Sequence, residues 1–179
     1  MAQRFEEARL ACDFADAWLV TKYDEWAFYR KQFQVACLGN KGVDFLALDP
    51  EYANLWLIEM KDYRQGPRDP DKLDLWEEVA VKMRDTLAGL VAAKIAAAEA
   101  EEKQFAGQAL SARRIFVILH LEQPAQHSKI FPRIFNPADV QQRLRQLVKP
   151  IDAHPRVIEL STHQQRVPWQ VVSLPAPAP

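Results

Sequence analysis

Three apolar runs of strand length limit what this chain can fold into more than any other feature of its sequence. They are residues 43–48 (VDFLAL), 55–61 (LWLIEMK) and 114–122 (RIFVILHLE). A turn at residues 49–54 joins the first two runs, which favours an antiparallel pair, and the third run is typical of a central buried strand. Between the second and third runs, residues 73–102 carry apolar side chains at helical spacing. This order predicts an α/β fold, a mixed sheet flanked by helices.

Shorter patterns predict the remaining elements. Residues 5–18 place apolar side chains at helical spacing, with charged residues between them, and predict a first amphipathic helix. Residues 34–38 (QVACL) and the glycine-containing turn that follows them predict a strand and a hairpin with the first run. Residues 19–33 fit either a short helix or a strand. Near the end of the chain, residues 156–160 and 169–174 predict two short strands.

Length and composition favour one domain. The chain has 179 residues and 49% of them are apolar, which is enough to bury a core. We expect a single domain over residues 1–174, in which a core of about 1–122 is followed by a C-terminal extension of about 123–174. That extension contains a helix predicted for residues 137–148. Residues 175–179 form a Pro/Ala tail that is expected to be disordered.

The sequence also excludes several classes of protein. Its apolar runs are interrupted by charges well before the ~20 residues that a membrane span needs, and no signal-like segment opens the chain. We therefore expect a cytoplasmic protein with no membrane partner. Cys12 and Cys37 form no CxxC pair, which predicts two reduced and buried thiols. The histidines show no close pairing of the kind that binds zinc.

Three charged residues interrupt the apolar strands. Strand alternation places Glu59 and Lys61 on one face, and pairing through the intervening turn would bring Asp44 opposite them. Two carboxylates held close together repel each other unless a cation lies between them, and Mg²⁺ prefers such oxygen ligands. Two structural alternatives stay open. Asp44 could instead bond the backbone of the nearby glycine-containing turn, and the other two residues could form an ion pair on an exposed edge.

This pattern resembles a known family. Residues 42–44 (GVD), fourteen intervening residues and then residues 59–61 (EMK) look like the motif of the PD-(D/E)XK nuclease superfamily, which has the restriction-endonuclease-like fold. The resemblance covers about residues 1–122, and the family order of helix, three antiparallel strands, helix and strand agrees with the predicted elements. Val43 stands where the motif has proline. The same three-letter spelling at residues 101–103 (EEK) lies at a predicted helix end, so spelling alone is a weak signal.

The resemblance implies a site and a chemistry. Asp44, Glu59 and the main-chain carbonyl of Met60 would bind Mg²⁺ or Mn²⁺, and Lys61 would assist the attacking water. Many members of the family add an acid from the first helix, for which the candidates here are Glu6 or Glu7. The implied activity is that of a magnesium-dependent hydrolase, an endonuclease or exonuclease that cuts phosphodiester bonds, with DNA expected as the substrate in preference to RNA.

A second hypothesis is a catalytically silent nuclease-like domain that binds nucleic acid or a protein partner. Either hypothesis is compatible with a homodimer. Charge is unevenly distributed, with a net charge of −6 over residues 1–103 and +5 over residues 104–179. The basic residues of the second part could hold phosphates or could be solvated surface charges; they include Arg113, Arg114, Arg143, Arg145 and Lys149.

Overall fold

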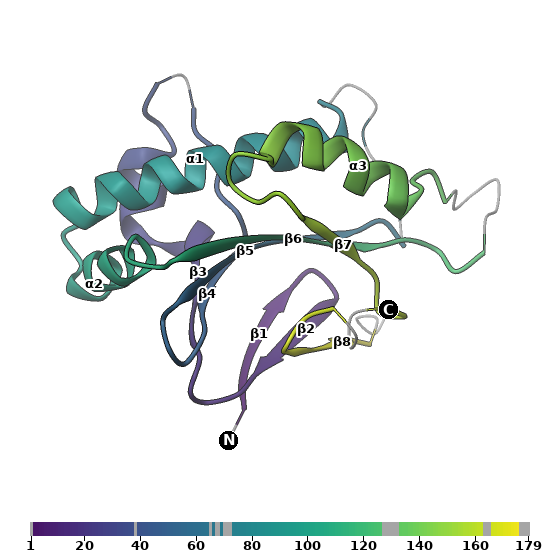
Figure 1. The fold of residues 1–179 in the computed structure, drawn as a ribbon, viewed down its shortest axis with the longest axis horizontal. Coiled ribbons are helices and arrows are strands. Elements are labelled where there is room, and N and C mark those ends of the chain that lie inside the picture. The colour runs from purple at the N-terminus through teal and green to yellow at the C-terminus, as the bar shows by residue number, and fades with distance from the viewer. Residues whose placement is uncertain are drawn as a thin grey trace.

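Two β-sheets and a group of helices form three layers (Figure 1). The computed structural model describes residues 2–37, 39–64, 66, 69, 73–126, 133–162 and 166–175. The helices cover one face of a five-stranded sheet, and a three-stranded sheet lies beneath the other face. The predicted mixed α/β fold with flanking helices is therefore confirmed, and the second sheet is an addition to it.

The main sheet has the strand order β3-β4-β5-β6-β7. Strand β4 is antiparallel to both β3 and β5, whereas β5, β6 and β7 run parallel. The strands are Leu19–Lys22 (β3), Phe45–Leu48 (β4), Asn54–Asp62 (β5), Arg114–Glu122 (β6) and Arg156–Ile158 (β7). The three apolar runs of the sequence thus form the neighbouring strands β4, β5 and β6. The parallel pair needs a long crossover, which the helices between β5 and β6 provide.

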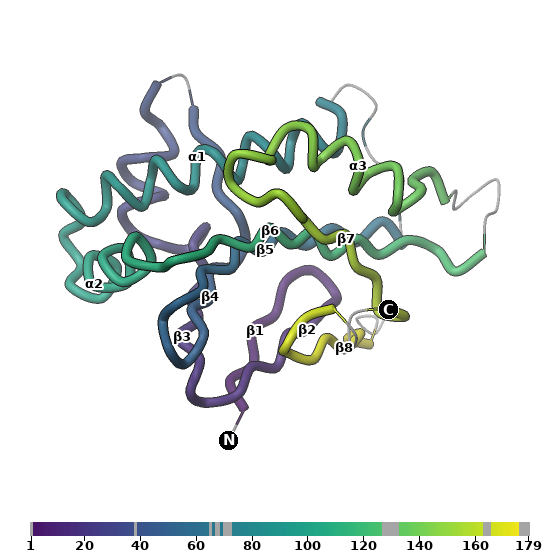
Figure 2. The backbone as a smooth tube through the Cα atoms, viewed as in Figure 1, coloured from purple at the N-terminus to yellow at the C-terminus, as the bar shows by residue number. Residues whose placement is uncertain are grey.

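The prediction of a helix for residues 5–18 is wrong, because β1 (Gln3–Glu7) and β2 (Leu10–Phe14) form a hairpin in this part of the chain. The small sheet consists of β1, β2 and β8 (Gln170–Ser173), with β2 in the middle. The chain reverses at Ala8, whose φ is +52°. Leu10, Cys12 and Phe14 pack into the core at every second position, which is the period of a strand. Strand β8 supplies the partner for β2 from the other end of the chain, as the tube in Figure 2 shows.

The strand predicted for residues 34–38 is also wrong. Residues 34–37 form turns, and residue 38 lies outside the described part of the chain. Two short helical turns precede them, the 3-10 turn η1 (Tyr23–Glu25) and the π-helical turn η2 (Tyr29–Phe33). The Asn40 side-chain amide donates to the carbonyls of Phe33 (2.8 Å) and Ala36 (3.1 Å), so it ties this turn to η2. Strand β3 takes the place beside β4 that the hairpin prediction gave to residues 34–38.

The single long helix predicted after the second apolar run is in fact two helices, α1 (Leu75–Ala96) and α2 (Ala100–Ala109). Phe105 of α2 packs edge-on against Trp26, with ring centroids 5.7 Å apart. The Glu102 carboxylate accepts hydrogen bonds from the main-chain N–H groups of Ala27 (2.6 Å) and Phe28 (3.1 Å). These tertiary contacts hold α2 against η1 and η2, and they outweigh the high helix propensity of the alanine-rich junction.

The predicted C-terminal helix is present as α3 (Pro137–Val148), which packs beside α1 (Figure 1). The Asn136 side chain caps it by accepting a hydrogen bond from Ala138 N at 3.0 Å. None of the helices among the described residues is long and apolar enough to cross a membrane. Residues 176–179 of the expected disordered tail lie outside the described part of the chain.

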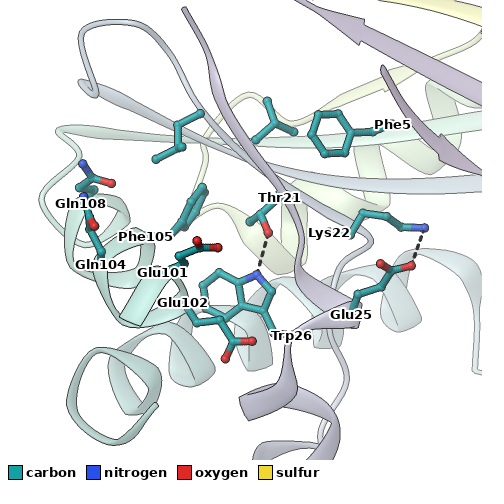
Figure 3. A pocket seen from close by; sticks show the side chains of 12 residues that line it. Phe5, Thr21, Lys22, Glu25, Trp26, Glu101, Glu102, Gln104, Phe105 and Gln108 are labelled. Atoms are coloured by element: carbon teal, nitrogen blue, oxygen red, sulfur yellow. Dashed lines mark hydrogen bonds and ion pairs between the residues drawn. The ribbon is translucent and has the colours of Figure 1, made fainter. Parts of the chain in front are cut away.

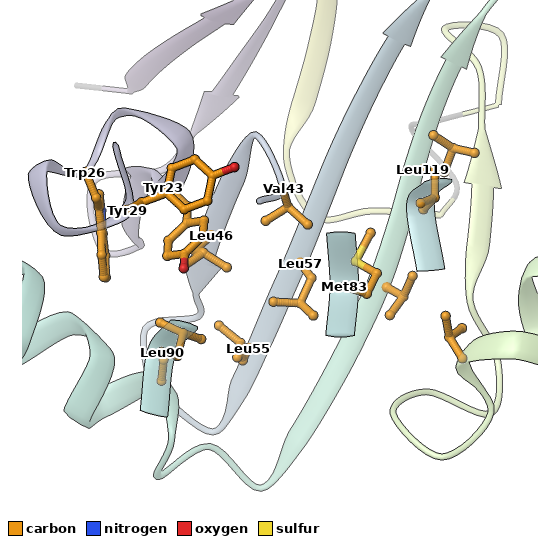
Figure 4. Close-up of a cluster of buried hydrophobic side chains, with 14 of the residues drawn as sticks. Tyr23, Trp26, Tyr29, Val43, Leu46, Leu55, Leu57, Met83, Leu90 and Leu119 are labelled. Carbon is orange, nitrogen blue, oxygen red and sulfur yellow. The ribbon is translucent and has the colours of Figure 1, made fainter. Parts of the chain in front are cut away.

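The main sheet separates two apolar clusters. Figure 4 shows the cluster on the helix side, where Leu57 of β5 and Leu119 of β6 meet Met83 of α1. The other cluster fills the space between the two sheets, with Trp56 and Cys12 among its buried members. Successive side chains of each strand therefore pack alternately into the two clusters. Because both faces of the sheet are buried, the apolar runs in the sequence are nearly continuous. The expectation of two buried thiols is met by Cys12 alone, since the Cys37 side chain is exposed.

Two helical glycines have opposite surroundings. A Cβ atom added to Gly89 of α1 would overlap the Tyr23 hydroxyl and lie 3.0 Å from Phe33 Cε1, whereas one added to Gly107 of α2 would meet nothing within 4 Å. Tyr23 is fully buried, so its ring has little room to move. Gly89 is thus required by close packing, and Gly107 is not.

We predict opposite effects of the same substitution at these two sites. Gly89→Ala overpacks the core around Tyr23 and lowers the free energy of unfolding by about 1–3 kcal/mol. Gly107→Ala raises it by about 0.5–1 kcal/mol, because alanine costs less backbone entropy in a helix. Urea unfolding followed by circular dichroism measures both values. A Gly89→Ala protein as stable as the wild type would show that the Tyr23 packing is looser than described.

Candidate functional site

The strand register brings two carboxylates together. Phe45 of β4 pairs with Ile58 of β5, so Asp44, which directly precedes β4, lies opposite Glu59. Both side chains are buried on the face that α1 covers. The Asp44 Oδ2 atom accepts a hydrogen bond from Met60 N at 2.7 Å, which fixes the carboxylate against β5. This bond goes to the neighbouring strand, not to the glycine-containing turn that was the structural alternative.

Two lysines neutralise these carboxylates. Lys82 Nζ of α1 lies 2.5 Å from Glu59 Oε1 and 3.6 Å from Asp44 Oδ1. Lys61 Nζ of β5 lies 3.0 Å from the same Glu59 oxygen and 2.8 Å from Glu78 Oε1. Glu78 and Lys82 are four residues apart on α1, so one face of the helix supplies both. We call these five residues the charge cluster.

Burial determines both the energy cost and the pKa values of the charge cluster. Glu59 has 0% of its surface exposed, so it is not part of an exposed edge, and its charge requires the two ammonium groups. Burial, and next the charge of Glu59, raises the pKa of Asp44 to about 7. Burial alone would lower the pKa of Lys82, but the carboxylates of Glu59 and Asp44 outweigh it and raise that pKa. The cluster therefore keeps both lysines charged and moves the pKa of Asp44 toward neutral pH.

A hollow of about 600 Å³ connects the charge cluster with solvent. Asp44 and Lys82 line it from the inside, and Asp24, Arg30 and Lys41 line it nearer the surface. Burial, and next the charge of Asp44, raises the pKa of Asp24 to about 6. The sequence suggests Asp24 only as a possible helix cap, because nothing in its local pattern shows that η1 places it beside Asp44.

A divalent cation fits this site only in part. The Lys82 ammonium lies between Asp44 and Glu59, at the place where a cation would bind both. Among the described residues, no group of three or more His, Cys, Asp or Glu side chains could hold a metal ion. Glu59 Oε2 is nevertheless buried without a hydrogen-bond partner, so this oxygen has an unused lone pair. A cation bound by both Asp44 and Glu59 would therefore have to displace Lys82.

The two candidates for an additional acid lie on β1, not on a helix. Glu7 forms an ion pair with Lys22 at 3.0 Å, and its charge contributes to the raised pKa of Asp44. Glu6 is exposed, and its main-chain carbonyl accepts a hydrogen bond from Lys22 Nζ at 3.0 Å. The structure thus places the charge of Glu7, not that of Glu6, within electrostatic reach of the cluster.

A second site lies at the opposite end of the main sheet, where β6 and β7 begin. A hollow of about 760 Å³ is lined by basic side chains, and we call it the basic hollow. Arg113, Arg114 and His154 are exposed in it, while Arg156 is half-buried. The buried Asp152 carboxylate holds the floor by accepting hydrogen bonds from His154 N (2.8 Å) and from the main-chain N–H of β6 (2.9 Å). Its acceptors are therefore occupied, and the arginines determine the charge of the hollow.

Arg156 is fixed by its surroundings. Its guanidinium lies 5.5 Å from the Trp56 ring centroid and 5.3 Å from that of Phe116, and Nη1 donates to the Arg166 carbonyl at 2.6 Å. Arg113 and Arg114 are among the phosphate ligands that the sequence suggests, but Arg156 is not, because only the pairing of β7 with β6 brings it to the same place. Arg114 of β6, Arg156 of β7 and Arg113, which directly precedes β6, thus surround one hollow.

Comparisons with known proteins point away from a nuclease. The chain is similar to a cysteine--tRNA ligase from Neisseria meningitidis serogroup A / serotype 4A (strain DSM 15465 / Z2491), with 37% identity over 156 residues. The match covers 70% of this chain and 22% of the ligase, so the chain spans about a fifth of the length of that relative. No family model matches the chain, and no solved structure matches it.

This similarity overturns the nuclease prediction. The relative is a tRNA ligase, so the PD-(D/E)XK resemblance and the predicted endonuclease or exonuclease activity are wrong. The motif is a weak predictor because a few residues on two paired strands do not show which side chains from other elements contact them. In the fold, Lys82 comes from a helix and binds both carboxylates of the apparent motif, Asp44 and Glu59.

The raised pKa of Asp44 predicts a pH-dependent stability. An unfolded aspartate ionises near pH 3.8, but Asp44 in the fold ionises near pH 7. The fold therefore favours the protonated form, and stability is lost as the pH rises between these values, by on the order of 4 kcal/mol at most. Asp44→Asn cannot ionise, so the wild type should lose stability relative to this variant between pH 4.5 and pH 8. Urea unfolding at both pH values with EDTA present measures the difference. Parallel pH profiles of the two proteins would contradict it.

Proposed function

We propose that this chain is an RNA-binding domain for tRNA that acts as part of, or together with, a protein of the aminoacyl-tRNA synthetase type. The observation that carries this proposal is the 37% identity to a segment of a cysteine--tRNA ligase. This function corresponds to the second hypothesis from the sequence, a nucleic-acid-binding domain without hydrolase activity. It replaces the expected preference for DNA with one for RNA.

The basic hollow is the surface best suited to this role. Guanidinium groups bind phosphate oxygens in a bidentate manner, and Arg113, Arg114 and Arg156 offer three of them around one concavity. A volume of about 760 Å³ lies within the range of ordinary ligand sites, so a phosphodiester and part of its nucleotide would fit. Backbone phosphates dominate the affinity of most proteins for nucleic acid, so the arginines of the hollow can anchor RNA through its phosphates.

We further propose that the main sheet has the restriction-endonuclease-like fold and serves as a scaffold for binding. The order of β3, β4 and β5, followed by α1 and then by β6 parallel to β5, supports this proposal. One departure is that β1 and β2 stand where the family order has a leading helix, and another is that η1 and η2 lie between β3 and β4. The charge cluster, with Lys82 between its carboxylates, then stabilises the domain and does not cut a substrate.

We predict that the basic hollow carries the affinity for RNA. The double variant Arg113→Ala/Arg114→Ala should bind an unmodified tRNA transcript about tenfold or more weakly, and the slope of log Kd against log salt should fall by about two. Lys31→Ala is the matched control, because Lys31 is exposed on η2 and does not line the hollow. Filter binding at several salt concentrations measures both quantities. Equal losses in the double variant and in the control would refute a role for the hollow, and no binding by the wild type would refute the RNA-binding function.

A second proposal concerns Asp44 and Glu59. We propose that these carboxylates, with the Met60 carbonyl, form a site for Mg²⁺ or Mn²⁺ in competition with Lys82. The unpartnered Glu59 Oε2 atom favours this proposal. Such an ion would supply positive charge in place of the ammonium, while Lys61 would keep its ion pair with Glu78. The ion would thus have a structural role in this site.

We predict that a divalent ion replaces the missing ammonium in Lys82→Met. In EDTA this variant should be about 3 kcal/mol less stable than the wild type, because it leaves Glu59 and Asp44 without their shared cation. Addition of MnCl₂ should restore most of the loss, and Glu59→Gln in the same background should abolish the restoration. Lys94→Met, an exposed lysine on the same helix, serves as the control. Thermal unfolding that is insensitive to Mn²⁺ in Lys82→Met would exclude the site.

A further inference from the structure

A pocket of about 600 Å³ lies along one edge of β3, as Figure 3 shows. All four residues of β3, Leu19 to Lys22, line this pocket. Successive residues of a strand point to opposite faces of the sheet, so all four line the same pocket only if it follows the edge of the strand. We call it the β3 pocket.

The edge that borders the β3 pocket faces away from the sheet. Strand β3 is the last strand of the main sheet and has β4 as its neighbour. Tyr23 N donates to Asp44 O at 3.0 Å, which identifies 23↔44 as a hydrogen-bonded pair of the antiparallel ladder. Because such pairs alternate, the main-chain groups of Val20 and Lys22 point away from β4. They offer the donor and acceptor pattern with which another extended chain can pair.

The walls of the β3 pocket are apolar and fixed. Phe5 of β1 lies on one side of the strand, and Trp26 and Phe105 lie on the other (Figure 3). Trp26 Nε1 donates to Thr21 Oγ1 at 2.8 Å, so its indole ring is held against β3. Phe105 packs edge-on against that ring. Side chains that alternate along an added strand would thus meet an apolar wall on either face.

The rim of the β3 pocket is acidic. Glu25, Glu101 and Glu102 line it with a single basic residue, Lys22. Lys22 is paired with Glu25 at 3.2 Å and with Glu7 at 3.0 Å, so these charges offset one another and the excess negative charge of the rim comes from Glu101 and Glu102. The rim therefore favours a ligand with positive charge.

A further acceptor in the β3 pocket lacks a partner. Gln108 of α2 lines the pocket, and its buried Oε1 atom has no hydrogen bond among the described residues. A donor from a bound chain would satisfy it. The pocket thus combines a backbone edge, apolar walls, an acidic rim and an unused acceptor.

We propose that the β3 pocket binds an extended segment of a partner protein, with basic and apolar side chains, as an added strand of the main sheet. Main-chain pairing with Val20 and Lys22 would provide affinity, and the aromatic walls and acidic rim would provide specificity. A second copy of this chain is a poorer occupant, because pairing of two β3 edges would bring the two acidic rims together. This interaction is independent of the basic hollow and of RNA binding.

Lys22 provides a matched pair of variants. Its φ is −83°, close to the value that proline requires, and its N–H points away from β4. Lys22→Pro therefore removes a donor from the edge without breaking the β3–β4 ladder. Lys22→Ala removes the same side chain and keeps the donor. Both changes make the rim more acidic, so charge alone would strengthen the binding of a basic peptide in both.

The test uses an acetylated, amidated peptide of sequence RVKVRVK and the full chain, with binding followed by chemical-shift changes in NMR spectra. We expect the wild type and Lys22→Ala to bind, Lys22→Pro to bind about tenfold more weakly, and the acidic peptide EVEVEVE not to bind. Glu101→Lys should also weaken the binding of RVKVRVK, whereas the tRNA affinity of Lys22→Pro should equal that of the wild type.

Several outcomes would overturn the proposal. They are equal peptide affinities of Lys22→Pro and Lys22→Ala, equal binding of the basic and acidic peptides, and no binding of RVKVRVK to the wild type. A dimer in sedimentation experiments that Lys22→Pro abolishes would assign the edge to a second copy of the chain instead. Unfolded NMR spectra of Lys22→Pro would move the comparison to Glu101→Lys, where unchanged peptide binding would equally overturn it.

Discussion

The fully buried carboxylate of Glu59 is the constraint on which the arrangement of the helix layer depends. A charge at that depth is tolerated only with close partners, and Lys61 and Lys82 provide them at 3.0 and 2.5 Å. Since Lys82 belongs to α1, this ion pair fixes how the helix lies over β5. The same proximity raises the pKa of Asp44, because one ammonium is shared between two carboxylates. Removing Lys82 would leave Asp44 without its ammonium partner and Glu59 with Lys61 alone.

The two ends of the main sheet differ in charge, although the whole chain has a net charge of only −1. Strand β5 rises about 17 Å between Asn54, beside the basic hollow, and Glu59, at ~3.3 Å per residue. The carboxylates of the charge cluster are paired with two lysines, so at that distance the cluster does not cancel the field of the arginines. A nearly neutral protein can therefore present a surface suited to phosphates.

The proposed functions use different parts of this fold. The basic hollow lies where β6 and β7 begin, and the charge cluster lies between the strand pair β4–β5 and α1. The β3 pocket lies along the edge of β3. This separation of the sites suits a domain that matches only one segment of a larger ligase. RNA and a protein segment could then be bound at the same time, because neither site shares residues with the other.

Local sequence determined the elements whose patterns are unambiguous. Runs such as 55–61 and 114–122 form strands because they bury both faces, and Asn136 begins α3 because its side chain caps the helix locally. Tertiary structure decided the rest. Residues 5–18 became a hairpin because β8 pairs with β2, and Asp44 and Glu59 share an ammonium because α1 places Lys82 between them. These outcomes depend on partners far away in the sequence, which no local period or short motif can encode.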